Sequence, residues 1–137
     1  MSATVSYSTL VHSNRFIREI GYQILADFTS FVDDERYVRQ LARGLSDNWS
    51  QVRMAASIAA RQFLLTQVEK SGISDLVGKL LLCRVCLNRF YVAEGVRNYN
   101  QETWSKVISS LGLESGRSLV KKHITDFTEY YRVCCLT

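Results

Sequence analysis

Apolar residues recur along this chain with the period of an α-helix. Near the N-terminus, every fourth position of one stripe is apolar, at Phe16, Ile20, Ile24 and Phe28. Residues four apart share one face of a helix, so the stripe predicts a helix that starts behind Asn14, whose amide suits an N-cap. No stretch alternates apolar and polar residues in the manner of a half-buried strand.

The helical period continues and predicts about six helices. The later apolar faces cover residues 38–45, 52–63, 76–87, 92–107 and 119–131. The acidic cluster Asp33-Asp34-Glu35 opens the second helix, where negative charge meets the positive end of the helix dipole. The 137 residues include seven glycines and no proline, which suits uninterrupted helices. We therefore predict one all-α domain over residues 1–137.

A short pattern repeats within these helices. Arg18 and Arg53, which are 35 residues apart, each follow a β-branched residue, Ile17 or Val52, and small residues come one turn later. At an offset of 40 the pattern returns more weakly, with Ala93 in place of the arginine. Single helix pairs of about 40 residues cannot bury their apolar faces alone, so neighbouring pairs are expected to stack.

The central copy carries the most specific motif. Residues 45–56 contain a turn aspartate, Asp47, then valine-arginine, then paired alanines. An amide pair at Asn48 and Gln51 has the spacing of a capping box. The segment resembles the second helix of HEAT repeats, and armadillo-type packing is a near alternative. The resemblance implies an α-α superhelix with roughly three stacked helix pairs, in which Arg18, Asp47 and Arg53 form a structural ladder between repeats.

The same resemblance implies a non-catalytic scaffold that binds a protein partner on its concave face, which second helices line. An exposed tryptophan is a common interface anchor. The candidate partner-binding residues on or beside these helices are Trp49, Arg53, Arg61, Arg89 and Arg97.

The arginines also raise a second hypothesis. The formal net charge is +4, and twelve of the 17 cations are arginine, which suits binding to a nucleic-acid backbone. Acidic residues such as Glu102 interleaved with the arginines would favour a protein partner. Arginines standing without such acids would favour phosphate.

Residues with catalytic or metal-binding chemistry are few. Cys83 and Cys86 form a C-x-x-C motif, but the other cysteines, Cys134 and Cys135, are adjacent and suit one tetrahedral zinc ion poorly. We expect reduced cysteines that pack as small apolar side chains, and a solvated His123. No phosphate-binding loop, nucleophile elbow or zinc-protease motif is present in the sequence. We expect no enzyme, no cofactor and no metal.

Two further expectations concern location and assembly. No apolar run approaches the roughly 20 residues of a membrane span, and the first residues lack the features of a secretory signal. We therefore expect a cytoplasmic or nuclear protein without a membrane partner. The last predicted helix ends in the apolar segment 130–136, where terminal repeats usually carry a polar face. This favours a fragment of a longer solenoid or self-association through the solenoid ends.

Overall fold

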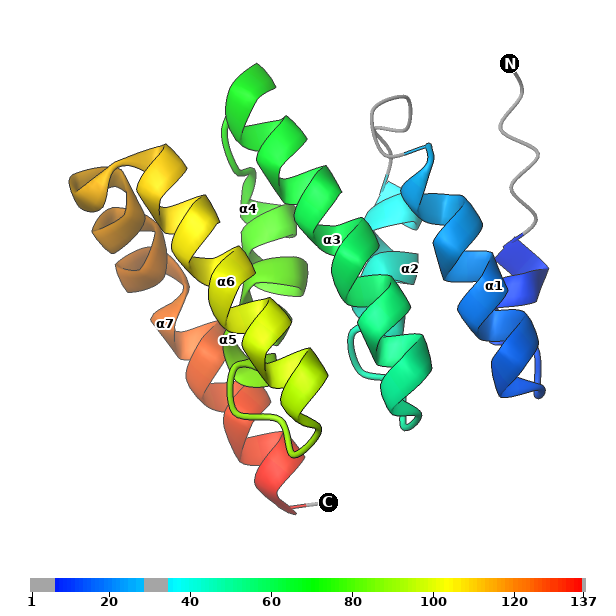
Figure 1. Cartoon of the computed structure of the whole chain (residues 1–137). Coiled ribbons are helices and arrows are strands. Elements are labelled where there is room, and N and C mark those ends of the chain that lie inside the picture. Colours follow the sequence, from blue (N-terminus) through cyan, green and yellow to red (C-terminus); the bar gives the residue numbers. More distant parts are fainter. Residues whose placement is uncertain (1–6, 29–34, 137) are drawn as a thin grey trace.

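The computed structural model describes residues 7–28 and 35–136, and all its regular elements are helical, so the predicted all-α class is confirmed (Figure 1). None of the described helices is both long enough and apolar enough to cross a bilayer. The elements are η1 (Tyr7–Val11), α1 (Arg15–Ala26), α2 (Glu35–Gly44), α3 (Ser50–Lys70), α4 (Asp75–Val77), η2 (Gly78–Leu82), α5 (Cys83–Asn88), α6 (Glu94–Leu111) and α7 (Leu113–Leu136).

In two parts of the chain one element follows another without a loop. α4, the π-helical turn η2 and α5 follow one another directly and form one rod. The break between α6 and α7 is the single residue Gly112, whose φ of +88° favours glycine. Two sequence features, Asp33-Asp34 and the side chains of the C-terminal segment 130–136, lie outside the described part of the chain.

The helices form two layers (Figure 1). α1, α3 and α6 lie side by side and run in the same direction, with α3 in the middle and in contact with both neighbours. η1, α2, the α4–η2–α5 rod and α7 make up the other layer, whose helices run in the opposite direction. Each helix of the first layer is therefore packed against helices before and after it in the sequence.

The core lies between the layers and uses aromatic and very small side chains together. The rings of Tyr37 and Phe63 pack with their centroids 5.3 Å apart. The Tyr22 hydroxyl donates to the backbone oxygen of Gln40 over 2.9 Å, which fastens α1 to α2. Alanines along α3, among them Ala56, are fully buried, so the two layers can approach closely.

The three helices of the first layer begin in the same way. The guanidinium groups of Arg18, Arg53 and Arg97 each donate to the backbone carbonyl six residues earlier, at His12, Asp47 and Tyr91. Arg97 is thus the equivalent of Arg53, 44 residues further on, and the predicted offset of 40 is wrong. α3 and the rod are longer than α1 and α2, which accounts for the larger spacing.

The sequence match at an offset of 40 arose because two valines lie one helical turn apart. Val92, which was aligned with Val52, is exposed in the connection before α6. Val96 is buried like Val52 and occupies the equivalent position. A sequence pattern that requires only a β-branched residue at this position cannot distinguish Val92 from Val96.

The start of α3 also differs from the prediction. The N-cap is Trp49, which makes no side-chain capping bond, so the expected capping box of Asn48 and Gln51 is wrong. Instead, the carboxylate of Asp47 accepts a hydrogen bond from the Trp49 N–H over 3.0 Å. The turn aspartate therefore orders the chain immediately before the helix.

Candidate partner-binding surface

A groove runs between α1 and α3 on the outward face of the first layer. It consists of two hollows, of about 220 Å³ and about 350 Å³, that share Glu19 and Gln51. The middle of the groove is lined by Met54 and Ile58 of α3, both partly exposed. An open channel with an apolar wall and polar neighbours is the kind of surface that takes up a peptide segment.

Trp49 closes one end of this groove. Its side chain is 46% exposed, and the Arg15 guanidinium lies 3.8 Å from the centre of its ring. The cation holds one side of the indole through a cation–π contact, and the exposed remainder borders the groove with Phe16. Trp49 is therefore both held in position and accessible, as an interface anchor must be.

A second groove separates α3 from α6 and is more polar. Leu65, Val68 and Glu69 form one side, and a row of α6 residues forms the other: Ser105, Lys106, Ser109 and Ser110. Its charges are of both signs, so its lining has no preference for either a cationic or an anionic ligand.

Arg53 and Arg61, predicted to bind a partner, fasten α3 to its neighbour. Arg53 Nη1 donates to Asn88 Oδ1 over 2.7 Å, and its guanidinium lies 3.9 Å from the centre of the Tyr91 ring. Arg61 Nε donates to Thr103 Oγ1 over 2.7 Å, and Nη2 donates to the Tyr99 carbonyl over 2.8 Å. Both side chains are only partly exposed.

Arg89 and Arg97 are engaged in a similar way. Arg89 Nε donates to the Cys86 carbonyl over 3.2 Å, and its guanidinium lies 4.7 Å from the centre of the Trp104 ring. Arg97 Nη1 donates to the Tyr91 carbonyl over 3.0 Å. The four arginines and Trp49 do not share one groove, and the prediction that all five bind a partner stays a prediction.

Acidic groups interleave with these arginines. Arg61 Nη1 lies 3.3 Å from the carboxylate of Glu102 on α6. Arg18 and Asp47 form a two-pronged ion pair, with Nε–Oδ2 at 2.9 Å and Nη2–Oδ1 at 3.1 Å. Both side chains of that pair are at least 85% buried, and the Asp47 hydrogen bond raises the pKa of Arg18.

The expected ladder residues are thus joined through Asp47. Arg53 Nε donates to the Asp47 backbone oxygen over 2.9 Å, while Arg18 reaches the carboxylate of the same residue from α1. One turn residue therefore connects the starts of α1 and α3. The charge-assisted pair is of the stronger kind.

Most residues that line the α1–α3 groove were not predicted from the sequence. They share the outward face of the first layer: Glu19, Gln23, Gln51, Met54, Ile58 and Gln62. The available signal was that α3 is apolar on more than one face, because helical spacing puts Met54 and Ile58 opposite Ala56 and Ala60.

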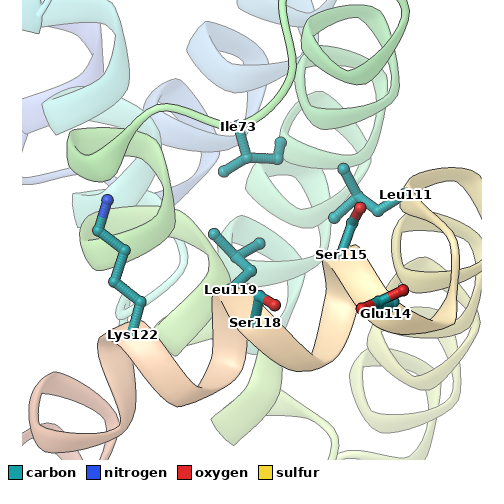
Figure 2. Close-up of a pocket in the computed structure, with 7 residues that line it drawn as sticks. All are labelled: Ile73, Leu111, Glu114, Ser115, Ser118, Leu119 and Lys122. Carbon is teal, nitrogen blue, oxygen red and sulfur yellow. The ribbon is translucent and has the colours of Figure 1, made fainter.

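A separate hollow, of about 410 Å³, lies where the loop before α4 meets the start of α7 (Figure 2). Ile73, Leu111 and Leu119 form its apolar part. The ammonium of Lys122, at its edge, pairs with Asp75 over 2.6 Å and lowers the pKa of that carboxyl. The lining has serine hydroxyls but no histidine beside them, so we assign it no reaction.

His123 is buried, contrary to the expectation that it is solvated. It is 5% exposed and faces η2, where a Cβ on Gly78 would lie 3.0 Å from its Nε2. Its Nδ1 lies 3.3 Å from Asp126 Oδ2, and its Nε2 is 3.9 Å from Asp75 Oδ1. The close packing of α7 on η2, which sequence spacing does not reveal, removes this ring from solvent.

Cys83 packs as a small apolar side chain. Burial raises the pKa of its thiol to about 12, so it stays protonated at neutral pH. Cys86, three residues on, is half-buried and also a free thiol. Among the side chains that the structure describes, no group of three histidine, cysteine or acidic residues is placed to hold a metal ion.

Comparisons with protein-family models, with curated proteins and with solved structures return no match.

Proposed function

We propose that this chain is a HEAT-type helical-repeat scaffold, non-catalytic, that binds a protein partner in the groove between α1 and α3. The observation that carries the proposal is the exposed Trp49 ring, held by Arg15 at the end of an apolar-walled groove. The HEAT assignment is supported by the Arg18–Asp47–Arg53 ladder. Stacked helix pairs create extended surfaces of this kind.

The lining of the groove indicates the chemistry of the partner. Met54 and Ile58 offer contacts to apolar side chains, and Gln23 and Gln62 offer amide donors and acceptors. On the α1 side, the two acids Glu19 and Asp27 outnumber the one cation, Arg15, which is engaged with Trp49. We therefore expect a peptide segment that carries apolar anchors together with basic residues.

The nucleic-acid alternative receives less support. The arginines on which it rests donate to backbone carbonyls and neighbouring side chains, as Arg61 does to Tyr99 and Thr103. Glu102 and Asp47 lie among them, which reduces the attraction for a phosphate backbone.

The proposal includes a cytoplasmic or nuclear location. It is supported by the free thiols of Cys83 and Cys86, which suit a reducing compartment.

A displayed peptide library selected on the immobilised chain tests the function. Selected peptides are titrated onto the isotope-labelled chain, and we expect amide shift changes in α1 and α3 around Gln23, Met54 and Ile58. Ile58→Glu places a charge in the groove and should weaken binding by about tenfold or more, equivalent to roughly 1.4 kcal/mol. Arg39→Ala, on an exposed face of α2, is the matched control and should leave affinity unchanged.

Two outcomes would contradict the proposal. Shift changes confined to other helices, with Ile58→Glu binding like the parent, would place the peptide elsewhere. Binding of a generic DNA duplex at low salt, with a steep log–log loss as salt rises, would favour the nucleic-acid alternative.

A further inference from the structure

The first helix carries an exposed apolar stripe, whose first residue, Phe16, also borders the α1–α3 groove. Phe16, Ile20 and Ile24 lie four residues apart and are 60%, 55% and 46% exposed. The opposite face of α1 is fully occupied, because Tyr22 and Leu25 are buried against the remainder of the molecule. Three large exposed apolar side chains in one row are more than scattered surface residues, and such a patch marks a contact surface.

The repeat register identifies what kind of contact this stripe makes. Ile20 and Ile24 occupy the positions that Ala55 and Ala59 hold in α3, 35 residues later. Both alanines are buried, and Ala55 lines the hollow between α3 and α1; Ala59 lies one turn later on the same face. The stripe on α1 is therefore the face by which a first-layer helix packs on the helix before it.

The same positions in α6 bear this out. They are held by Tyr99 and Thr103, 44 residues beyond Ala55 and Ala59. Both contact Arg61 of the preceding helix, α3. Within the described residues, α1 alone of the three first-layer helices has no first-layer helix before it.

The opposite end of the stack has a complementary surface. A hollow of about 330 Å³ between α6 and α7 is lined by Trp104, Ile108, Leu113 and Val120, with Arg117 and Lys121 beside them. Trp104 and Ile108 hold the positions of Ala60 and Leu64 in α3, which are fully buried in the interior. In α6 the same positions are only partly buried, so this groove is open to further helices.

We infer that a second copy of this chain stacks head to tail, placing the Phe16–Ile20–Ile24 stripe of one copy in the α6–α7 groove of the next. The bulky isoleucines replace the alanines of the internal contact and match a hollow. Charge also matches. When α1 of one copy lies parallel to α6 of the next copy, the exposed Asp27 at the C-terminal end of α1 comes near Arg117 and Lys121 in the hollow. Contacts of this type join unlike surfaces and extend into open chains.

Two variants, each damaging one end, test the inference. Ile20→Glu places a charge in the middle of the stripe and leaves the α6–α7 groove unchanged. Val120→Glu places a charge in the groove and leaves the stripe unchanged. Sedimentation of the parent chain across a concentration series should show a mass that rises past that of a dimer. Each variant alone should stay monomeric, and an equimolar mixture should form a 1:1 dimer through the one intact pair of surfaces.

The control is Val92→Glu, which charges an exposed apolar residue that lines neither end and should assemble like the parent. Helical circular dichroism of all variants checks that they fold. A monomeric parent at several hundred micromolar (a dissociation constant weaker than about 1 mM, or −4.1 kcal/mol) would overturn the inference. Assembly of Val120→Glu with itself would also overturn it, because it would indicate contact between two like ends.

Discussion

Single small residues set how closely the helices approach one another. Gly44, the last residue of α2, lies against Tyr22 of α1 and Ala56 of α3. A Cβ placed on Gly44 would lie 2.5 Å from the Ala56 Cβ, and an alanine Cβ has no rotamer by which to move away. Glycine at this position is thus required for packing rather than for a backbone turn.

We predict that Gly44→Ala lowers the free energy of unfolding by about 1–3 kcal/mol, the usual cost of overpacking a core. Urea denaturation followed by circular dichroism measures it. Gly95→Ala is the matched control, because a Cβ there meets nothing within 4 Å. It should be neutral or stabilise by up to about 1 kcal/mol through helix propensity, and a loss equal to that of Gly44→Ala would disprove the steric explanation.

At the scale of elements, the turn between α2 and α3 connects the starts of the first-layer helices α1 and α3. Asp47 accepts hydrogen bonds from Arg18 of α1 and from the Trp49 N–H at the start of α3. Its backbone oxygen accepts from Arg53. A single residue therefore aligns two first-layer helices and places Trp49 at the end of the proposed binding groove.

Asp47→Ala should cost about 1.5–3 kcal/mol of unfolding free energy, the range for hydrogen bonds to a charged group. The Arg18 guanidinium would be left partly buried without its carboxylate. The comparison is Glu35→Ala, which removes an exposed i, i+4 pair with Arg39 and should cost less than about 1 kcal/mol. Equal effects in thermal and urea unfolding would mean that burial of the Asp47 pair contributes nothing.

For the whole molecule, burial couples stability to alkaline pH. Burial raises the pKa of the Tyr22 and Tyr37 hydroxyls above the ordinary 10.0 and that of the Cys83 thiol to about 12 from 9.0. In the unfolded chain these groups lose their protons near their ordinary pKa values, while in the folded protein they keep them. The unfolded state then binds fewer protons, so stability is full below pH 9 and falls above it.

We predict that the free energy of unfolding declines above about pH 9, by at most about 1.4 kcal/mol per pH unit for each group. Urea unfolding at pH 8, 9, 10 and 11 measures the slope. Tyr22→Phe loses the hydrogen bond to Gln40 and is less stable at pH 8, but its decline above pH 10 should be shallower. An unchanged slope would show that Tyr22 does not take part.

The sequence by itself determined the helical class. A 3.6-residue period is a property of consecutive residues, so the stripes of α1 and α3 could be read directly. The pairing of Asp47 with Arg18 and Arg53 was an expectation drawn from the HEAT resemblance, since Arg18 lies 29 residues from Asp47. Only the tertiary structure decided how α6 aligns with α3, because Val92 and Val96 fit the pattern equally and burial alone distinguishes them.

The tertiary structure also decided which side chains face outward. Arg61 found the carbonyl and ring of Tyr99 in α6, and Arg53 found Asn88 and the ring of Tyr91 at the end of the rod. His123 was enclosed by η2. These partners lie far away in the sequence, and the free energy of each contact depends on how two helices are placed. The outward face of α3 and the exposed stripe of α1 follow from that same placement, because a helix with two apolar faces can bury either one.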